Sequence, residues 1–375
     1  MEIIAKTLQG LEGILAGEIE ALGGTNITPL KRAVKYEGDL ELLYKSNYLL
    51  RTALRIITPF KEEVVKNEHQ LYKKVYDYPW EELFSVKDSF SINPIVNSEI
   101  FRHSQYAGLK TKDAIVDRFR DKFGRRPNVN PVNALIQLDL HIREDKLTLS
   151  LDSSGHSLHM RGYRMYPVEA PLNEVLAAGI VMLSGWNGTD TFVDPMCGSG
   201  TILIEAARIA GNIPPQRKDV SFCFQNWTNY DVKLWEKIIA EADANIKPIE
   251  CEILGFDKSL QCVKASETNI LEAGLENKIK VSRKDFFLQT DLPKCLIITN
   301  PPYDERLKLE DDMLFYKQIG DLMKKQLTGS AVWIFSGNME ALKHVGLKPS
   351  KRISLMNGPI EAGFYKFEVY EGSKR

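Results

Sequence analysis

The stretch Asp194-Pro195-Met196-Cys197-Gly198-Ser199-Gly200-Thr201 decides the fold of this chain. A short apolar run, 191–193, precedes it and a helical pattern, 202–210, follows it, which predicts a strand, a glycine turn and a helix. Glycine lets the backbone approach a ligand closely, and the first turn of a helix presents free N–H groups. The sequence therefore predicts a ligand site at the carboxyl end of a strand.

A second motif, Asn300-Pro301-Pro302-Tyr303, follows another apolar run, 295–299. Two prolines cannot continue a central strand, so the chain must turn where this strand ends. In an open α/β sheet the carboxyl ends of parallel strands share one edge, where ligands bind. We therefore expect both motifs to line one crevice.

Alternating strands and helices are predicted from about residue 161 onward, which indicates a mostly parallel sheet covered on both faces. The expected strands are 191–194, 252–257, 279–282, 295–299, 330–335, 352–355 and 364–370, and the expected helices are 172–184, 201–210, 231–245, 259–272 and 311–327.

The first 160 residues predict two smaller α+β regions. Residues 1–60 alternate short strands and helices in a manner compatible with a ferredoxin-like unit. Residues 61–160 mix short helices with an alternating strand, 89–96, and a hairpin of strands 134–142 and 146–151. With residues 161–375 as a third region, this organisation fits the length of 375 residues.

Composition indicates a globular protein without an overall charge, since 43% of residues are hydrophobic, 26% are charged and the net charge is −1. No apolar run is long enough to span a bilayer, and the first residues lack a signal-peptide pattern, so a cytoplasmic location is expected. The five cysteines form no Cys-x-x-Cys pair, and His156 and His159 have no matching third ligand nearby. We expect reduced thiols and no metal site.

The segment 102–126 concentrates eight basic residues against three acids, with apolar residues at helical spacing between them. It predicts a helix with a basic exterior. Such a face is either an ordinary solvated surface or a phosphate-binding surface for nucleic acid. The basic residues are Arg102, Lys110, Lys112, Arg118, Arg120, Lys122, Arg125 and Arg126.

Three aspartates end successive predicted strands and indicate the kind of ligand. Asp194 precedes the glycines, where an acid suits a cationic or zwitterionic ligand such as S-adenosylmethionine better than a pyrophosphate. The third glycine of a dinucleotide fingerprint is missing, because position 203 is Leu. Asp257 is placed to accept from ribose hydroxyls and Asp285 from an adenine amino group. A single Asp at the end of a strand is often only a helix cap. It is the series of three that favours a cofactor site.

Asn300 and its neighbours have the chemistry to activate an exocyclic amine of a nucleobase, whose lone pair is delocalised into the ring. The Asn300 side-chain oxygen and the Pro301 carbonyl can each accept one amine hydrogen, and Tyr303 can stack on the base. Methyl transfer then needs positioning and no strong general base. The alternative is an ordinary Asn-Pro turn.

These motifs resemble those of class I S-adenosylmethionine-dependent RNA methyltransferases with an Asn-Pro-Pro-Tyr motif, most closely the bacterial 23S rRNA guanine-N2 methyltransferases of the RlmL type. Residues 157–164, 194–207 and 300–307 carry the resemblance, and residues 61–155 resemble a THUMP RNA-binding domain. The resemblance implies a seven-stranded, mostly parallel sheet whose last strand is antiparallel. Asp304 departs from the glycine common in relatives, which puts fine specificity in doubt.

The resemblance also implies the site residues. The target base would be held by Asn300, Pro301, Pro302 and Tyr303. The cofactor would contact Asp194, Pro195, Met196, Cys197, Gly198, Ser199, Gly200, Thr201, Asp257, Asp285 and Asn300. In a THUMP-like context, phosphate binding becomes the favoured interpretation of Arg102, Lys110, Lys112, Arg118, Lys122, Arg125 and Arg126.

The sequence thus predicts methyl transfer to the exocyclic N2 of a guanine in 23S rRNA. The substrate would be either naked RNA or a large-subunit precursor. The same motifs are compatible with tRNA guanine-N2 or with adenine-N6 as the acceptor. An RNA-binding assembly factor without catalytic activity is an alternative of another class, and a nicotinamide-dependent oxidoreductase is disfavoured by Leu203. The oligomeric state is left open.

Overall fold

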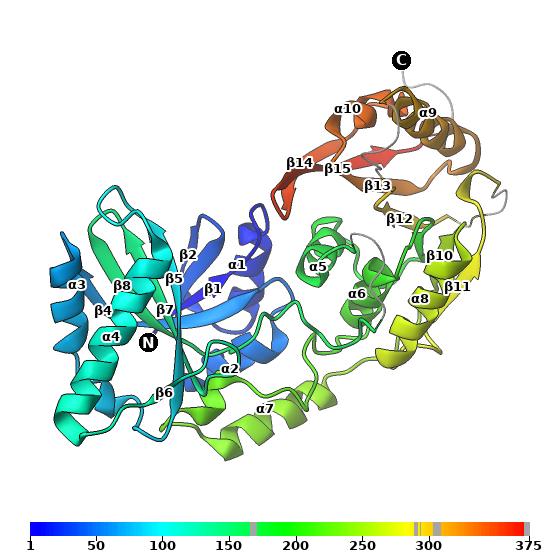
Figure 1. The fold of residues 1–375 in the computed structure, drawn as a ribbon. Coiled ribbons are helices and arrows are strands. Elements are labelled where there is room, and N and C mark those ends of the chain that lie inside the picture. The colour runs from blue at the N-terminus through cyan, green and yellow to red at the C-terminus, as the bar shows by residue number, and fades with distance from the viewer. Residues whose placement is uncertain (166–170, 289–291, 293, 303–308, 371–375) are drawn as a thin grey trace. The chain divides into compact units, whose positions relative to one another are not determined.

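The computed structural model describes residues 1–165, 171–288, 292, 294–302 and 309–370 (Figure 1). The chain forms two compact units, neither of which is continuous in sequence. The first unit consists of Met1–Lys6, Glu18–Leu158 and Lys218–Ile239, and the second of Thr7–Gly17, His159–Arg217 and Ala240–Arg375.

The first unit is built on one eight-stranded sheet with the order β2-β3-β1-β4-β8-β7-β5-β6. Its pairs are antiparallel except that β5 is parallel to β6 and β7. Pairing of β4 with β8 makes the regions before and after residue 60 parts of a single sheet. The strands are β1 (Glu2–Lys6), β2 (Thr25–Leu30), β3 (Ala33–Glu37), β4 (Arg55–Val64), β5 (Ser89–Asn97), β6 (Asn128–Val129), β7 (Ile136–Arg143) and β8 (Lys146–Asp152).

Helices α3 (Glu68–Tyr76) and α4 (Ser104–Phe123) lie side by side in the first unit (Figure 1). Alternate residues of β7, such as Leu138 and Leu140, join the core that these helices also enter. The two-residue period of the strand thus directs one face inward. The unit also contains α2 (Leu40–Leu49) and the short turns Trp80–Glu82 and Cys223–Asn226, while α1 (Glu12–Ala21) begins in the second unit and ends in the first.

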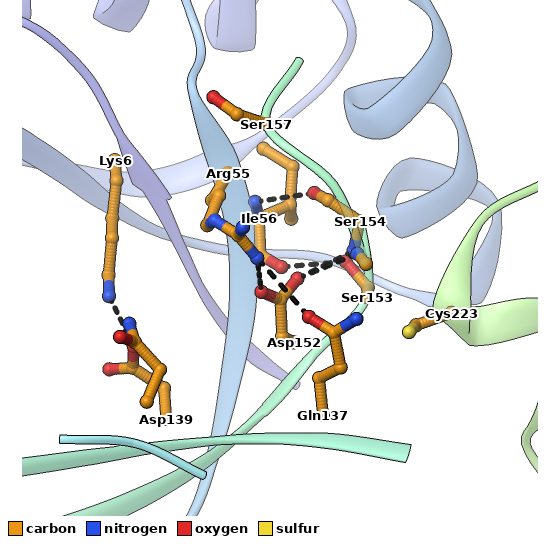
Figure 2. A network of polar contacts seen from close by, with 12 residues as sticks. Lys6, Arg55, Ile56, Gln137, Asp139, Asp152, Ser153, Ser154, Ser157 and Cys223 are labelled. Atoms are coloured by element: carbon orange, nitrogen blue, oxygen red, sulfur yellow. Dashed lines mark hydrogen bonds and ion pairs between the residues drawn. The ribbon is translucent and has the colours of Figure 1, made fainter. Parts of the chain in front are cut away.

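Ion pairs cross the strands of this sheet (Figure 2). Arg55 of β4 pairs with the buried Asp152 of β8, and Lys6 of β1 lies 2.6 Å from the buried Asp139 of β7. The other oxygen of Asp152 accepts the N–H of Ser154 at 2.9 Å. Because buried carboxylates need such partners, these contacts favour one register of the central strands.

Residues 218–239 pack in the first unit, although they follow α6 (Thr201–Ala210) in sequence. The ring of Phe224 stacks on Tyr44 of α2 at 4.3 Å, and Trp235 meets Tyr48 edge-on at 5.4 Å. The helix predicted at 231–245 is α7 (Val232–Ala244), but its first half belongs to this aromatic cluster. Burial of the aromatic rings explains why a simple strand–helix alternation is interrupted here.

The second unit contains a seven-stranded sheet with the order β11-β10-β9-β12-β13-β15-β14. Its pairs are parallel except those that β15 makes with β13 and β14. This confirms the predicted α/β fold with a mostly parallel sheet and an antiparallel last strand. The strands are β9 (Phe192–Asp194), β10 (Ile253–Asp257), β11 (Ile279–Arg283), β12 (Leu296–Thr299), β13 (Ala331–Ser336), β14 (Lys351–Asn357) and β15 (Ile360–Glu368), and the remaining helices are α5 (Glu174–Leu183), α8 (Leu260–Glu272), α9 (Leu309–Gln326) and α10 (Met339–Leu342).

Two negative findings apply to the described residues. Among them, no helix combines the length and the apolar character needed to cross a bilayer. In the same part of the chain, no group of three or more His, Cys, Asp or Glu side chains is arranged to hold a metal ion.

Candidate functional site

The aspartates predicted to bind the cofactor and the predicted catalytic Asn300 lie at one edge of the seven-stranded sheet. Strands β9, β10, β11 and β12 run parallel, so their carboxyl ends share that edge. Asp194 and Asp257 are the last residues of β9 and β10, Asp285 follows β11 by two residues, and Asn300 follows β12 directly. The strand order therefore brings together residues that are more than a hundred positions apart in sequence.

Asp194 is the most deeply buried of these acids, with 1% of its surface exposed. Its Oδ1 accepts the N–H of Met196 at 3.2 Å. The pKa of Asp194 is raised to about 7, mainly because burial disfavours the charged form and also because the Asp257 carboxylate lies nearby. The hydrogen bond from the Met196 N–H opposes this rise in part. A cation beside Asp194 would stabilise its charged form.

The glycine turn that follows β9 is held by backbone contacts. Cys197 N–H donates to the Phe256 carbonyl at 2.9 Å, and Gly200 N–H donates to the Cys197 carbonyl at 2.8 Å. Gly198 and Gly200 have φ angles of 53° and 79°, in the left-handed region that favours glycine. A Cβ on Gly200 would lie 2.3 Å from Ser266 Oγ, whereas one on Gly198 would meet no atom within 4 Å. The space beside Gly198 is open to a ligand.

Asp257 connects the glycine turn to the next helix. Its Oδ2 accepts the N–H of Gly198 at 3.1 Å and its Oδ1 accepts the N–H of Ser259 at 2.8 Å. Ser259, rather than Asp257, caps α8 through its side chain. Each carboxylate oxygen can accept a further hydrogen bond, so these contacts leave the carboxylate able to bind a hydroxyl group.

Asp285 lies at the next strand along the edge. Its Oδ1 accepts the N–H of Phe287 at 3.0 Å. Phe286 enters the core, while the half-buried Phe287 packs edge-on against Phe315 at 5.4 Å. Of these two aromatic neighbours of Asp285, Phe286 is therefore committed to the core.

The Asn-Pro-Pro-Tyr motif begins at a buried acceptor. The Asn300 side-chain oxygen is buried and has no hydrogen-bond partner among the described residues. A buried polar atom without a partner is costly, and this oxygen is therefore available to accept a hydrogen bond from a ligand. Pro301 is buried and Pro302 is exposed, while Tyr303 lies outside the described residues.

The predicted basic surface is more heterogeneous than the sequence indicated. Arg118 of α4 forms a two-bond pair with Glu81, at 2.9 and 2.7 Å, and Lys122 lies 2.5 Å from the same carboxylate. These bonds, chiefly those of Arg118, hold the pKa of Glu81 well below its usual value. Lys112 pairs with Asp113 at 2.7 Å. The charges of these basic side chains are thus offset locally.

Other basic side chains are better placed for a partner. Arg102, Arg125 and Arg126 flank α4 and are exposed, and none of them makes an ion pair with another described residue. Lys110 Nζ lies 5.2 Å from the ring centre of Tyr72. Unbalanced positive charge therefore lies mainly at residues that flank α4, with Lys110 in addition within the helix.

Two residues that touch the glycine turn were not predicted. The Asn269 side chain of α8 donates to the Ser199 carbonyl, and the Arg164 guanidinium lies 3.3 Å from the Thr201 hydroxyl. Asn269 lies on the apolar face of a predicted helix. An amide at a position expected to be buried is the sequence signal that could have identified it. Arg164 entered the sequence analysis only within the stretch 157–164 that carries the resemblance.

Comparison with known proteins identifies three matching family models. The first, described as "RMKL-like, methyltransferase domain", matches residues 161–366. A THUMP domain matches residues 65–152, and the "RlmL ferredoxin-like domain" matches residues 2–57.

Curated relatives resemble nearly all of the chain. A protein of Synechocystis sp. named "Putative RNA methyltransferase" is 34% identical over 98% of this chain and 96% of its own length. The "Ribosomal RNA large subunit methyltransferase K/L" of Syntrophotalea carbinolica is 34% identical over 99% of this chain. The chain spans about half the length of that relative, 54%, and 50% of the protein of the same name from Cellvibrio japonicus.

Solved structures are similar over the same extent. A putative methyltransferase complexed with SAH superposes with a TM-score of 0.88 at 28% identity, covering 99% of both chains. A possible methylase from Clostridium difficile superposes with a TM-score of 0.89 at 28% identity, covering 100% of this chain and 99% of the other.

Proposed function

Because this chain belongs to the family of RMKL-like methyltransferases, we propose that it transfers a methyl group from S-adenosylmethionine to the exocyclic N2 of a guanine in 23S rRNA. The names of the K/L relatives support ribosomal RNA of the large subunit as the substrate. The observation that carries the proposal is the buried Asn300 oxygen, which has no hydrogen-bond partner among the described residues and lies at the edge where the glycine turn leaves β9.

The residues around the glycine turn fit S-adenosylmethionine. Asp194 suits the cationic methionine end, Asp257 the ribose hydroxyls and Asp285 the adenine amino group. The open space beside Gly198 allows a ligand to approach the backbone. The SAH bound in a similar solved structure supports this assignment. S-adenosylmethionine supplies an electrophilic methyl group on a positively charged sulfur.

The chain's own contribution to the reaction is positioning of the acceptor amine. Asn300 Oδ1 accepts one amine hydrogen and the Pro301 carbonyl accepts the other, which directs the nitrogen lone pair toward the methyl carbon. The new N–C bond forms as the C–S bond breaks, and the nitrogen then loses a proton to water. In this proposal, Tyr303 stacks on the target base.

The first unit supplies the RNA-binding surface in this proposal, with its THUMP region as the support. We propose exposed Arg102, Arg125 and Arg126 as its principal phosphate contacts, with Lys110, Lys112, Arg118 and Lys122 secondary. The division into residues 1–60, 61–160 and 161–375 and the cytoplasmic location stay predictions. A base within a duplex must be flipped out or presented in an unfolded precursor.

The test is transfer of labelled methyl groups to separately purified 23S rRNA, 16S rRNA and tRNA from cells that lack this gene, followed by digestion to nucleosides. We expect label in N2-methylguanosine from 23S rRNA. Asn300→Ala should lower kcat by about 10²–10³-fold, as loss of one transition-state hydrogen bond typically does.

The other outcomes distinguish the alternatives. Label in tRNA alone would keep the mechanism and replace the substrate. Cofactor binding without transfer to any RNA or to a large-subunit precursor, together with full cellular function of Asn300→Ala, would favour an assembly factor. Binding of NAD in place of S-adenosylmethionine would contradict the proposal.

A further inference from the structure

Asn269 joins two separate backbone segments through both ends of its side-chain amide. Its Nδ2 donates to the Ser199 carbonyl at 3.0 Å, and its Oδ1 accepts the N–H of Met165 at 3.0 Å. Only 1% of the residue is exposed. Ser199 lies 70 positions away in sequence and Met165 lies 104 away. The amide is therefore a fixed link among α8, the glycine turn and the segment before α5.

Arg164 ties the same segment to the far side of the glycine turn. Its Nη2 donates to the Leu172 carbonyl at 2.8 Å and to the Thr201 hydroxyl at 3.3 Å, while its Nε donates to Glu174 at 2.9 Å. Arg164 and Asn269 thus contact the residues immediately after and before Gly200. The turn is held from α5 on one side and from α8 on the other.

The segment 161–165 is also fixed to α6. Arg161 and Tyr163 both bond to Glu205, a buried residue of α6, with the Tyr163 hydroxyl donating at 2.9 Å. Residues 161–165 are therefore attached to α5, α6 and α8, the three helices that bracket the glycine turn. The orientation of the Ser199 peptide depends on this framework because Gly200 itself is conformationally permissive.

We propose that Asn269 is a positioning residue for the cofactor site. By fixing the Ser199 carbonyl, and together with Arg164, it holds the turn 198–201 in the form that binds S-adenosylmethionine. This inference rests on the proposed function. Asn269 acts through the Ser199 backbone, so its amide governs cofactor affinity rather than the methyl-transfer step.

The test is Asn269→Asp, which keeps an acceptor for Met165 N–H but replaces the donor facing the Ser199 carbonyl by an oxygen. We expect the Kd for S-adenosylmethionine, measured by calorimetry without RNA, and its KM to rise about tenfold or more. At saturating cofactor, kcat and the KM for RNA should stay within about twofold of the wild type. Arg164→Lys loses the guanidinium contacts with the Leu172 carbonyl and the Thr201 hydroxyl. It should raise the Kd and KM for S-adenosylmethionine by a smaller factor, again without changing kcat.

A matched control exists in the first unit. Asn47 is also buried, and its amide donates to the Leu43 carbonyl and accepts from Ser154, one of the serines in Figure 2. Asn47→Asp should lower the melting temperature without changing the Kd for S-adenosylmethionine. The control separates loss of a buried amide from loss of the link to the glycine turn.

The outcomes are distinct for the inference and for the function it rests on. If the wild type binds S-adenosylmethionine and both Asn269→Asp and Arg164→Lys bind it equally well, Asn269 serves packing alone and the inference is wrong. A proportional loss of kcat at saturating cofactor would also overturn it. If the wild type does not bind S-adenosylmethionine, the proposed function itself fails.

Discussion

At the scale of single residues, the burial of Asp194 and its proposed role in cofactor binding make opposite demands on one carboxyl group. Its pKa is raised to about 7, chiefly by burial. If the charged form binds the cationic end of the cofactor, affinity should fall as the pH falls below 7, approaching tenfold per unit. Calorimetric Kd values from pH 6 to 8.5 check this. Asp194→Asn should bind weakly with no such dependence, and a pH-independent wild type would contradict the assignment.

The same shift predicts an effect on stability. A carboxyl whose folded pKa lies above its unfolded value of 3.8 binds more protons when folded, so its contribution to stability falls as the pH rises from about 4 to 7. Asp194→Asn should therefore raise the melting temperature at pH 8, by an amount equivalent to a few kcal/mol at most, and much less at pH 4.5. Calorimetric scans without cofactor test this, and a lower melting temperature at pH 8 would show that the carboxylate stabilises the fold.

At the scale of elements, the glycine turn offers two substitutions that should differ in kind. Gly198→Ala meets no atom within 4 Å, so it should cost only about 1–2 kcal/mol of backbone strain. Gly200→Ala adds a clash with Ser266 and should destabilise the protein more. Both should weaken cofactor binding, because the proposed cofactor site lies beside Gly198. Melting temperatures and Kd values separate the effects, and equal melting temperatures would contradict the prediction.

Helix α4 permits a similar comparison for RNA. Arg125→Ala combined with Arg126→Ala should weaken binding to 23S rRNA and lower the salt slope of log K by about 0.7–0.9 per lost phosphate contact. Arg118→Ala should instead lower the free energy of unfolding by roughly 1–3 kcal/mol, because Arg118 is bonded to Glu81. Filter binding at several salt concentrations and denaturant unfolding test the pair. A larger RNA defect in Arg118→Ala would return the contact surface to the middle of the helix.

These elements also show what the sequence can predict. The strand, turn and helix of residues 191–210 were predicted because apolar periodicity and glycines are local signals. The pairing of Arg118 with Glu81, 37 positions away, and the link from Asn269 to Ser199 are not local, and both side chains occupy helices with ordinary patterns. Residues whose role lies in a distant partner were therefore the ones that the sequence did not reveal.

At the scale of the whole molecule, sequence order and spatial order differ. The region after residue 160 contributes 218–239 to the first unit, and the region before it contributes 7–17 to the second. Helical periodicity predicted α7, but it contained no information about which sheet the helix would accompany. The aromatic residues of 222–235 place α7 with the first unit, because large rings need a partner surface on which to be buried.

This exchange predicts that the first unit depends on a segment encoded within the second. Trp235, 5% exposed, contacts Tyr44, Tyr48 and Phe224. Trp235→Ala should cost about 3–5 kcal/mol, as comparable core truncations do. Hydrogen exchange should accelerate in α2 and the eight-stranded sheet, with the seven-stranded sheet still protected.

The matched control reverses the pattern. Trp333 of β13 is buried and stacks on Phe364 of β15 at 4.4 Å, so Trp333→Ala should expose the seven-stranded sheet to exchange and spare α2. Because unfolding is local when units are separately cooperative, the two variants should give complementary exchange maps. Identical maps would mean that the two units unfold as one cooperative body. Trp235→Ala would then report global stability, and the dependence of the first unit on residues 218–239 would lose its support.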